Sequence, residues 1–331
     1  MPFESKLFDY NLPRESINQN PYTNPDDSKL FIAETKQIYS FRDFNSIINS
    51  PSLFILNKST VHNVRIKTKK NTGGSIEIFI LEILNDNIAK CLIKSTDSKK
   101  ISKSYILENF KFEIIDIENE IFHIKTNKDI LEIIEEYGTT PLPPYIEDDS
   151  DKYKYYNNQF SDGGFSVASP TAGLHFSNNK IEELKNAGHE IVYVNLDVNI
   201  DTFKPVTVEY LEDHEIHNEN YNISKSDYEK IIDAKNNNLD IYCVGTTSLR
   251  AIETAYLTGD LSGSTKYFIY PDTKINIPNY LITNFHAPKS SLLSIVACIY
   301  GQQWPSLYEY ALKKGLKFLS FGDAVLFKVH E

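Results

Sequence analysis

The feature that most restricts the fold is a change of pattern in the first half of the chain. Between Val64 and Ile124, short apolar runs alternate with turn signals such as Asn71-Thr-Gly-Gly74 and Glu118-Asn119. Short runs rich in β-branched residues and separated by such turns predict strands joined by hairpins. The expected strands cover 64–68, 76–84, 88–93, 110–117 and 120–124, and a helix over 128–137 follows them. The segment therefore predicts a small all-β module.

From Gly163 onward, predicted strands and helices alternate. Helices are expected at 178–187, 225–236, 249–257 and 291–299, and strands at 190–196, 203–208, 240–244 and 281–284. A further strand is expected over 318–327, and the apolar runs 30–33 and 53–56 suit buried strands near the start. Because strand-then-helix order favours parallel pairing, this part of the chain predicts an α/β sheet.

Composition narrows the class of protein. The 331 residues are 41% hydrophobic, which is enough for a sizeable core. Cys91, Cys243 and Cys298 have no paired spacing, so we expect neither a disulfide framework nor a thiolate metal site, as in a reducing cytoplasm. No stretch approaches the roughly 20 apolar residues of a membrane helix, and no targeting signal is evident. We expect a soluble cytoplasmic protein.

The net charge of −11 argues against a surface covered with basic patches for nucleic acid. Two local basic runs, Arg65–Lys70 and Lys99–Lys103, are compatible with phosphate binding. They are equally compatible with strand edges that lysines protect from pairing with another chain.

The segment Ser166–Phe176 combines a rigid Pro170, a permissive Gly173, several hydroxyls including that of Thr171, and the imidazole of His175. Pro fixes φ and Gly allows positive φ, so backbone N–H groups here can turn toward a ligand. A loop that leads into a helix N-terminus suits a polar or anionic group. The alternative is an ordinary loop with a histidine in the core.

A second segment, Val244–Arg250, joins a predicted strand to a predicted helix. Gly245 permits close backbone approach, so a ribose, carboxylate or phosphate can be held at the helix dipole. The hydroxyl residues that follow are Thr246, Thr247 and Ser248. The phosphate-binding motifs of nucleoside triphosphate and NAD sites are absent from this segment. The alternative is simple helix capping, with Arg250 in a surface ion pair.

A third segment, His214-Glu-Ile-His217-Asn-Glu219, places two imidazoles and a carboxylate within six residues. With no Cys or third His nearby in the sequence, metal binding is not expected. General acid/base work suits these residues better, because histidine titrates near neutrality and a carboxylate can set its tautomer. The alternative is a polar segment that faces solvent.

A fourth segment, 281–293, ends an apolar strand in Asn284, His286, Lys289 and Ser290 before an apolar helix. A lysine at a helix start opposes the helix dipole, which predicts an anion nearby. Near the C-terminus, Asp323 interrupts an apolar run. A buried aspartate needs partners, so it either supports a catalytic histidine or satisfies loop amides.

Six ordered segments are similar to the motifs of one enzyme family. They are Pro-Thr-Ala-Gly-Leu-His-Phe (170–176), Asp-Thr-Phe-Lys-Pro-Val (201–206), His-Glu-Ile-His-Asn-Glu (214–219), Val-Gly-Thr-Thr-Ser-Leu-Arg (244–250), Leu-Ile-Thr-Asn-Phe-His-Ala-Pro-Lys-Ser (281–290) and Ser-Phe-Gly-Asp-Ala (320–324). Segments 8–13, 72–74 and 141–146 resemble the family's N-terminal and linker signatures. Over nearly its whole length, the chain resembles the S-adenosylmethionine:tRNA ribosyltransferase-isomerases of queuosine biosynthesis.

This resemblance implies a fold and a reaction. The fold is an α/β main domain carrying the active site (1–63 and 141–331), with an inserted all-β, barrel-like minor domain (64–140). The reaction moves the ribosyl group of S-adenosylmethionine onto the 7-aminomethyl-7-deazaguanine base of the tRNA anticodon loop, forms epoxyqueuosine and releases adenine and methionine. S-adenosylmethionine is a co-substrate, and no metal or membrane is implied. For the oligomeric state we expect a monomer or a homodimer.

The reaction requires a base beside the sulfonium, an acid for the departing adenine, and groups that hold ribose and methionine. The resemblance implies these catalytic candidates: His175, His214, His217 and His286, with Glu219 or Asp323 orienting one of them. It implies these substrate-binding candidates: Thr171, Gly173, Thr202, Phe203, Gly245, Thr246, Thr247, Ser248, Arg250, Asn284, Lys289 and Ser290. Among these, Arg250 and Lys289 are expected to pair with a carboxylate or phosphate.

Three segments depart from the family's patterns. The usual Asn-Asp-Thr-Arg-Val-Ile-Pro-Ala-Arg is Asn57-Lys-Ser-Thr-Val-His-Asn-Val-Arg65 here, and His-Val-Gly-x-Gly-Thr-Phe is Asp197-Val-Asn-Ile-Asp-Thr-Phe203. The third, Tyr-Gln-Thr-Val-Tyr, is Tyr153-Lys-Tyr-Tyr-Asn157. These changes leave two alternatives to the tRNA-modifying enzyme: a paralogue with a small-molecule acceptor and no tRNA, and an inactive relative that serves as a binding module.

Overall fold

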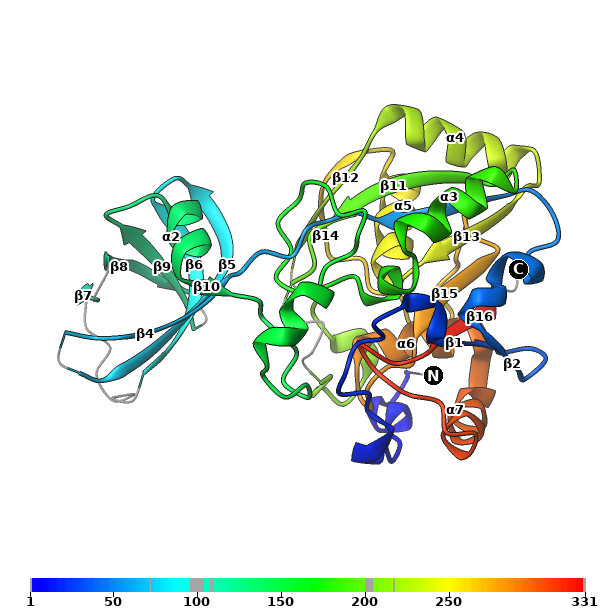
Figure 1. Cartoon of the computed structure of the whole chain (residues 1–331), viewed down its shortest axis with the longest axis horizontal. Helices are drawn as coiled ribbons and strands as arrows, with labels where there is room; N and C mark the ends of the chain where they lie inside the picture. Colours follow the sequence, from blue (N-terminus) through cyan, green and yellow to red (C-terminus); the bar gives the residue numbers. More distant parts are fainter. Residues whose placement is uncertain are drawn as a thin grey trace. The chain divides into compact units, whose positions relative to one another are not determined.

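The computed structural model describes residues 2–71, 73–95, 104–107, 110–118, 120–199, 205–216 and 218–329. The chain divides into two compact units (Figure 1). The larger unit comprises Met1–Thr60, Pro143–Gly164 and Ser169–Glu331, and the smaller unit comprises Val61–Leu142 and Phe165–Ala168. The candidate residues Thr202, Phe203 and His217 lie outside the described residues.

A mixed sheet forms the centre of the larger unit. Its described strands run in the order β14-β12-β11-β3-β13-β15-β16-β1-β2. Their bounds are β1 (Lys29–Ile32), β2 (Gln37–Ser40), β3 (Ser52–Asn57), β11 (Glu190–Leu196), β12 (Glu219–Ile223), β13 (Asp240–Val244), β14 (Ser262–Thr265), β15 (Tyr280–Asn284) and β16 (Ala324–Lys328). Strands β11, β3, β13 and β15 are mutually parallel, which confirms the parallel pairing predicted from strand-then-helix order.

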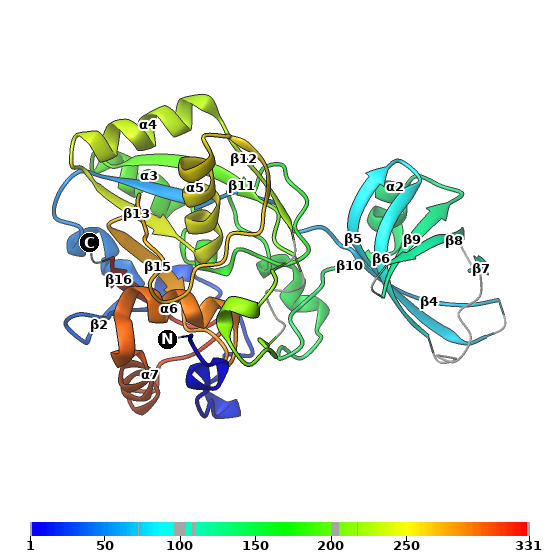
Figure 2. The ribbon, with the colours of Figure 1, turned by 180° about the vertical axis from the view of Figure 1, so that it is seen from behind.

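Strand β3 lies in the middle of the sheet, and every one of its residues is buried. A strand covered on both faces needs apolar side chains in both directions, which explains the continuous run Leu53–Leu56. Helix α3 lies in front of the sheet in Figure 1 and α5 lies in front of it in the reverse view of Figure 2, so helices cover both faces.

Three helices of the larger unit begin at a serine that caps them. The described helices of this unit are α1 (Phe44–Ile47), α3 (Asn178–Asn186), α4 (Lys225–Asn236), α5 (Thr246–Thr258), α6 (Ser291–Tyr300) and α7 (Trp304–Lys313). Ser177, Ser224 and Ser290 each accept a hydrogen bond from a backbone N–H in the first turn of α3, α4 and α6. Such caps satisfy donors that the helix itself leaves unpaired.

On one face of the sheet, a core of aromatic rings joins α1, β3 and the segment before α3. Phe44 packs against Phe54 and Phe176, with ring centroids 5.8 and 5.5 Å apart. Phe54 stacks on Tyr242 of the neighbouring strand at 4.9 Å. This packing fixes the segment Thr171–His175, a 3₁₀ helix, against the sheet.

The smaller unit is an antiparallel sheet with the order β10-β4-β5-β6-β9-β8-β7 among its described strands. The bounds are β4 (Arg65–Lys69), β5 (Ser75–Asn85), β6 (Ile88–Ser95), β7 (Ser104–Ile106), β8 (Lys111–Glu118), β9 (Ile121–Thr126) and β10 (Gly138–Thr139), with the helix α2 (Ile130–Tyr137) before β10. A bridge between Lys70 and Leu107 connects the end of β4 to the end of β7. This contact between opposite sides of the sheet gives the unit its barrel-like character, and the strands predicted from alternation are confirmed.

Some predicted boundaries are wrong. Of the strand expected over 203–208, residues 205–208 form only an isolated bridge at Pro205. The C-terminal strand begins at Ala324 and not at Phe318, because the preceding residues form a turn with positive φ (67°) at Leu319. Helix α5 starts at Thr246, earlier than the expected Leu249. No helix in the described part of the chain is long and apolar enough to cross a membrane.

Candidate active site

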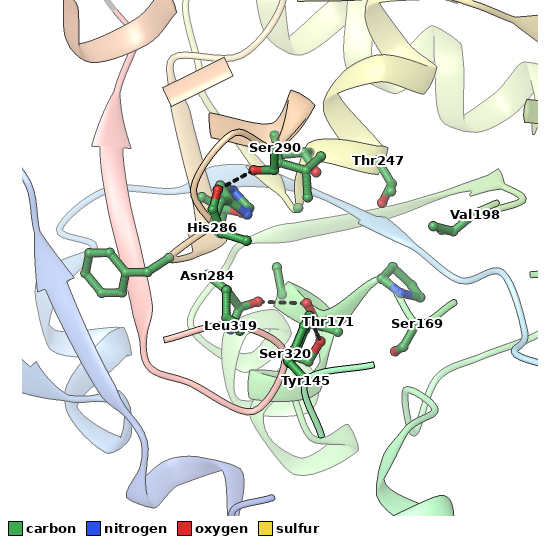
Figure 3. A pocket seen from close by; sticks show the side chains of 18 of the residues that line it. Tyr145, Ser169, Thr171, Val198, Thr247, Asn284, His286, Ser290, Leu319 and Ser320 are labelled. Carbon is green, nitrogen blue, oxygen red and sulfur yellow. Dashed lines mark hydrogen bonds between the residues drawn. The ribbon is translucent and has the colours of Figure 1, made fainter. Parts of the chain in front are cut away.

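A cavity of about 120 Å³, here called the central cavity, lies at the carboxyl edge of the parallel strands in the larger unit. Its lining includes the residues that directly follow β13 and β15, together with Val198 beyond the end of β11 (Figure 3). Ligands of open α/β sheets characteristically bind at this edge, because loops and helix N-termini converge there. Sequence-predicted residues on its wall are Thr171, Gly245, Thr246, Thr247, Asn284, His286 and Ser290.

Gly245 turns the chain from β13 into α5 with φ 88° and ψ 150°, a conformation that side chains other than hydrogen disfavour. Among the described residues no side-chain hydrogen bond caps α5, so the first backbone N–H groups of this helix have no side-chain partner there. Thr247 Oγ1 also faces this region and accepts a hydrogen bond from Asn57 Nδ2 at 3.1 Å. Ser248, by contrast, donates its hydroxyl to Val244 O at 2.7 Å and is used within the helix.

A chain of hydrogen bonds connects the cavity wall with the core. Thr171 Oγ1 donates to Asn284 Oδ1 (3.0 Å), and Asn284 Nδ2 lies 3.2 Å from His175 Nε2. His175 Nδ1 lies 2.9 Å from Ser28 Oγ, which donates to Pro25 O. Because the Ser28 proton is committed to Pro25 O, the network assigns the proton of His175 to Nδ1 and leaves Nε2 as the acceptor for Asn284.

His175 is therefore placed to orient Asn284. Its ring is buried, stacks on Phe41 with centroids 5.2 Å apart, and borders a further cavity of about 100 Å³ on the other side of the wall. Burial lowers the pKa of His175 to about 4, so the ring is neutral at neutral pH. The sequence left two interpretations of His175: a ligand-binding residue, or a histidine in the core of an ordinary loop. In the structure His175 is buried and supports the cavity residue Asn284.

His286 lines the central cavity itself. Its Nε2 lies 3.1 Å from Thr283 Oγ1, and its backbone is held by the hydroxyls of Tyr308 and Tyr10. Burial lowers the pKa of His286 to about 3. A neutral imidazole of this kind can accept a proton or donate a neutral N–H, but it is not a cationic acid at neutral pH.

A second cavity of about 390 Å³, here called the side cavity, shares the wall residues Pro205 and Leu292 with the central cavity. His214, Glu219 and Arg250 line it. Glu219 Oε2 accepts a hydrogen bond from Arg250 Nη1, and both side chains are buried. The alternative in which Arg250 makes a surface ion pair is therefore wrong, because its ion pair is buried. The described contacts of Glu219 do not include a histidine.

Two predicted residues have other partners. Lys289 Nζ lies 3.1 Å from Asp9 Oδ2, and both side chains are about half exposed. The anion predicted near this lysine is thus a carboxylate of the chain itself. Asp323 does not line the central cavity: Oδ1 accepts from Tyr22 Oη and Lys29 N, and Oδ2 accepts from Lys317 N, all at 2.8 Å. It satisfies loop amides, the second of the two roles considered for it.

Gly173 and Ser290 serve the shape of the site. A Cβ on Gly173 would lie 2.6 Å from Asn158 Nδ2, so the 3₁₀ helix packs closely there only because this residue is glycine. Ser290 donates its hydroxyl to Ala287 O and caps α6 while it lines the central cavity. Thr202, Phe203 and His217 lie outside the described residues.

Sequence reasoning missed Tyr145 and Ser320 as cavity residues, and Asn57 as a hydrogen-bond partner of the cavity residue Thr247. Asn57 ends the apolar run of β3, and its Oδ1 accepts from the backbone of Ser59 and Leu196. Tyr145 and Ser320 line the central cavity and are hydrogen-bonded to each other at 2.7 Å (Figure 3). Asn57 could have been found as a polar residue at the end of a buried strand.

Residues of the segments that depart from the family's patterns make hydrogen bonds in the structure. Asp197, where the family usually has histidine, accepts a hydrogen bond from Ser59 Oγ at 2.7 Å. Asn199, where the family usually has glycine, donates its backbone N–H to Glu219 Oε1 at 2.8 Å and lines the side cavity. Tyr153, in the 3₁₀ helix Ser150–Tyr155, donates its hydroxyl to Oδ1 of Asp148, which precedes this helix.

Comparisons with known proteins cover almost the whole chain. Residues 5–327 match the family model described as queuosine biosynthesis protein. An S-adenosylmethionine:tRNA ribosyltransferase-isomerase of Sulfurihydrogenibium sp. is 39% identical over 96% of this chain and 98% of its own length. One of the same name from Francisella tularensis subsp. mediasiatica is 36% identical over 96% and 98%.

A solved structure gives the same result. The crystal structure of the S-adenosylmethionine tRNA ribosyltransferase from Thermotoga maritima is 28% identical, with a TM-score of 0.54 over 97% of this chain and 99% of that one. Sequence and fold thus agree over nearly the full length of each protein. The chain belongs to the queuosine biosynthesis protein family.

Proposed function

We propose that this protein transfers and isomerises the ribosyl group of S-adenosylmethionine onto the 7-aminomethyl-7-deazaguanine base of tRNA. The products are epoxyqueuosine in the tRNA, adenine and methionine. The observation that carries the proposal is the near full-length match to relatives named S-adenosylmethionine:tRNA ribosyltransferase-isomerase. The convergence of Thr171, Asn284 and His286 on one cavity supports it.

We assign the active site to an α/β main domain (1–63 and 141–331) and treat 64–140 as an inserted β-rich minor domain. The support is that every residue of the central cavity belongs to the larger compact unit. The tRNA anticodon loop is the proposed macromolecular substrate, and exposed Lys67 and Lys69 on β4 are candidates for phosphate contacts.

His286 is the proposed proton-transfer residue, because it is the histidine that lines the central cavity among the described residues. Burial lowers its pKa and keeps the imidazole neutral, so one ring nitrogen has a lone pair at neutral pH, as removal of a proton beside the sulfonium requires. Thr171 and Asn284 are proposed to hold ribose hydroxyls, with His175 as a positioning residue that fixes the Asn284 amide. The uncapped first turn of α5, with Thr246 and Thr247, offers further donors.

The decisive experiment uses purified protein and S-adenosylmethionine, with and without tRNA that carries the aminomethyl-deazaguanine base. Mass spectrometry follows adenine, methionine and the tRNA nucleosides. Release of both small products that depends on this tRNA, together with a ribosyl-derived mass gain in the tRNA, is the expected result. Consumption of S-adenosylmethionine without tRNA, or only with a small acceptor, would instead identify a paralogue. Absence of both turnover and ligand binding would identify an inactive relative.

A further inference from the structure

We propose that the side cavity binds the α-amino-acid end of S-adenosylmethionine, with Arg250 on its carboxylate and Glu219 on its ammonium group. This inference rests on the proposed function, since it names the part of that substrate which the side cavity receives. It also divides the substrate between two cavities: the nucleoside end in the central cavity and the methionine end in the side cavity.

The first observation is an unused donor on Arg250. Only 6% of its side chain is exposed; Nε donates to Tyr267 O at 2.9 Å and Nη1 donates to Glu219. Nη2 is buried and has no hydrogen-bond partner in the described part of the chain. A buried donor of a charged group without an acceptor is costly, and Arg250 lines the side cavity. A ligand carboxylate there would supply the acceptor in the geometry that guanidinium groups prefer.

The second observation is the placement of Glu219. Its Oε1 accepts from Asn199 N and its Oε2 accepts from Arg250, so each oxygen keeps a lone pair for another donor. Glu219 lines the same cavity. A carboxylate fixed beside a guanidinium presents opposite charges side by side, which complements the ammonium and carboxylate of an α-amino acid.

The charges around the cavity distinguish an amino acid from a phosphate. Besides Glu219, the acidic residues Asp213 and Glu215 line the cavity, whereas Arg250 is the one arginine on its wall among the described residues. A phosphate would bring up to two negative charges into this surplus of carboxylates. A methionine end that carries an ammonium and a sulfonium brings two positive charges and one negative charge, so it suits the site better.

The remaining wall suits the methylene groups of methionine. Phe268, Ile269 and Ile295 line the side cavity, and the ring of Phe268 lies edge-on to His214 with centroids 5.3 Å apart. Leu292 and Pro205 line both cavities, so an extended ligand can contact them between its two ends. This arrangement puts the sulfonium between the two cavities.

The first test needs no variant. Dissociation constants of the protein are measured by calorimetry for S-adenosylmethionine, for its decarboxylated analogue and for 5′-methylthioadenosine, with and without the substrate tRNA. Loss of a charge-assisted pair of hydrogen bonds should weaken binding of the decarboxylated analogue about 10- to 100-fold relative to S-adenosylmethionine. Equal affinities for these two ligands would overturn the proposal, while turnover with tRNA would leave the proposed function intact.

The second test uses Arg250→Met. The variant should bind S-adenosylmethionine as weakly as its decarboxylated analogue but should bind 5′-methylthioadenosine as the unchanged protein does. An equal loss for all three ligands would show a merely structural role and would overturn the proposal. Fluorescence of the buried Trp304 reports whether the larger unit is folded, and Arg42→Met, at an exposed arginine paired with Asp27, is the matched control.

Two further measurements complete the design. Glu219→Gln should weaken the binding of S-adenosylmethionine more than the binding of an analogue that lacks the amino group. If the variant weakens the binding of both ligands equally, Glu219 does not contact the ammonium group and this part of the proposal is wrong. Inorganic phosphate should not compete with S-adenosylmethionine; competition that Arg250→Met abolishes would reassign the site to a phosphate and overturn the inference. If no adenosyl ligand binds under any condition and no turnover occurs, the proposed function fails as well, a pattern distinct from the others.

Discussion

Lowering the pH from 7.5 to 5 should destabilise the larger unit through His175, and glutamine at this position should remove that part of the loss. The histidine is buried against Phe41, and its pKa falls from 6.5 to about 4 on folding. A group whose pKa is lowered in the folded state favours folding above its unfolded pKa. The stability is lost as the pH falls from 6.5 toward 4, because the unfolded chain takes up the proton first.

The size of the effect follows from the pKa values. At pH 5 the unfolded histidine is largely protonated and the folded one is not. At roughly 1.4 kcal/mol per pH unit, the free energy of unfolding is therefore about 2 kcal/mol lower at pH 5 than at pH 7.5. His286, with its pKa lowered to about 3, should contribute a similar loss. Together, these two residues should cost the unchanged protein about 4 kcal/mol between the two pH values, and His175→Gln should lose about half as much.

The assay is urea unfolding at both pH values, followed by the fluorescence of Trp304. This is the one tryptophan of the chain, it is buried, and it belongs to the larger unit. Loss of ring packing lowers the stability of His175→Gln at both pH values equally, so it cancels in the difference. His62→Gln, in the smaller unit, controls for removal of a histidine. An unchanged pH dependence in His175→Gln would refute the argument that His175 is held neutral by burial.

Other substitutions test individual contacts. Gly245→Ala should destabilise the larger unit by about 1–3 kcal/mol in urea unfolding, because φ 88° and ψ 150° strain any side chain; an unchanged midpoint would show that the turn relaxes. Asn284→Ala should lower kcat/KM for S-adenosylmethionine by about tenfold or more, because the proposed hydrogen bond to ribose is lost. His175→Gln should cause part of this loss. If Asn284→Ala and the unchanged protein have equal kcat/KM values, Asn284 does not bind the substrate. Lys289→Met should change the free energy of unfolding by less than about 1 kcal/mol, because its pair with Asp9 is half exposed; a larger change would show a role beyond this ion pair.

The sequence predicted the helices and strands that have a clear local pattern of apolar residues or a capping residue. Strand β3 is a continuous apolar run and α4 follows a serine cap, so both have nearly the expected bounds. The strands β12 and β14 were missed because their residues are mostly polar or small; β12 pairs with β11 and β14. Their stability as strands comes from that ladder and not from their own composition. The early start of α5 was missed because threonine and serine are weak helix formers.

At the site, sequence predicted residue types better than partners. The motifs supplied Thr171, Asn284 and His175, but the hydrogen bonds that join them connect residues more than 100 positions apart. The pairing of Glu219 with Arg250 depends on the position of β12 within the sheet, between β14 and β11, which the local sequence pattern does not contain. Tyr145 and Ser320 stand in segments that resemble family motifs, but their hydrogen bond to each other depends on the fold and could not be predicted from either segment.

The pairing of β1 with β16 has a consequence for synthesis of the protein. Leu30 is in register with Ala324, so β1, which is synthesised early, cannot pair with β16 until the end of the chain has been synthesised. Until then, β1 has only β2 as a partner. The smaller unit, whose strands are local in sequence, can complete its pairing much sooner. On the ribosome, the inserted unit should therefore fold ahead of the sheet that surrounds it in sequence, and the edge of β1 should stay open to chaperones until the last strand emerges.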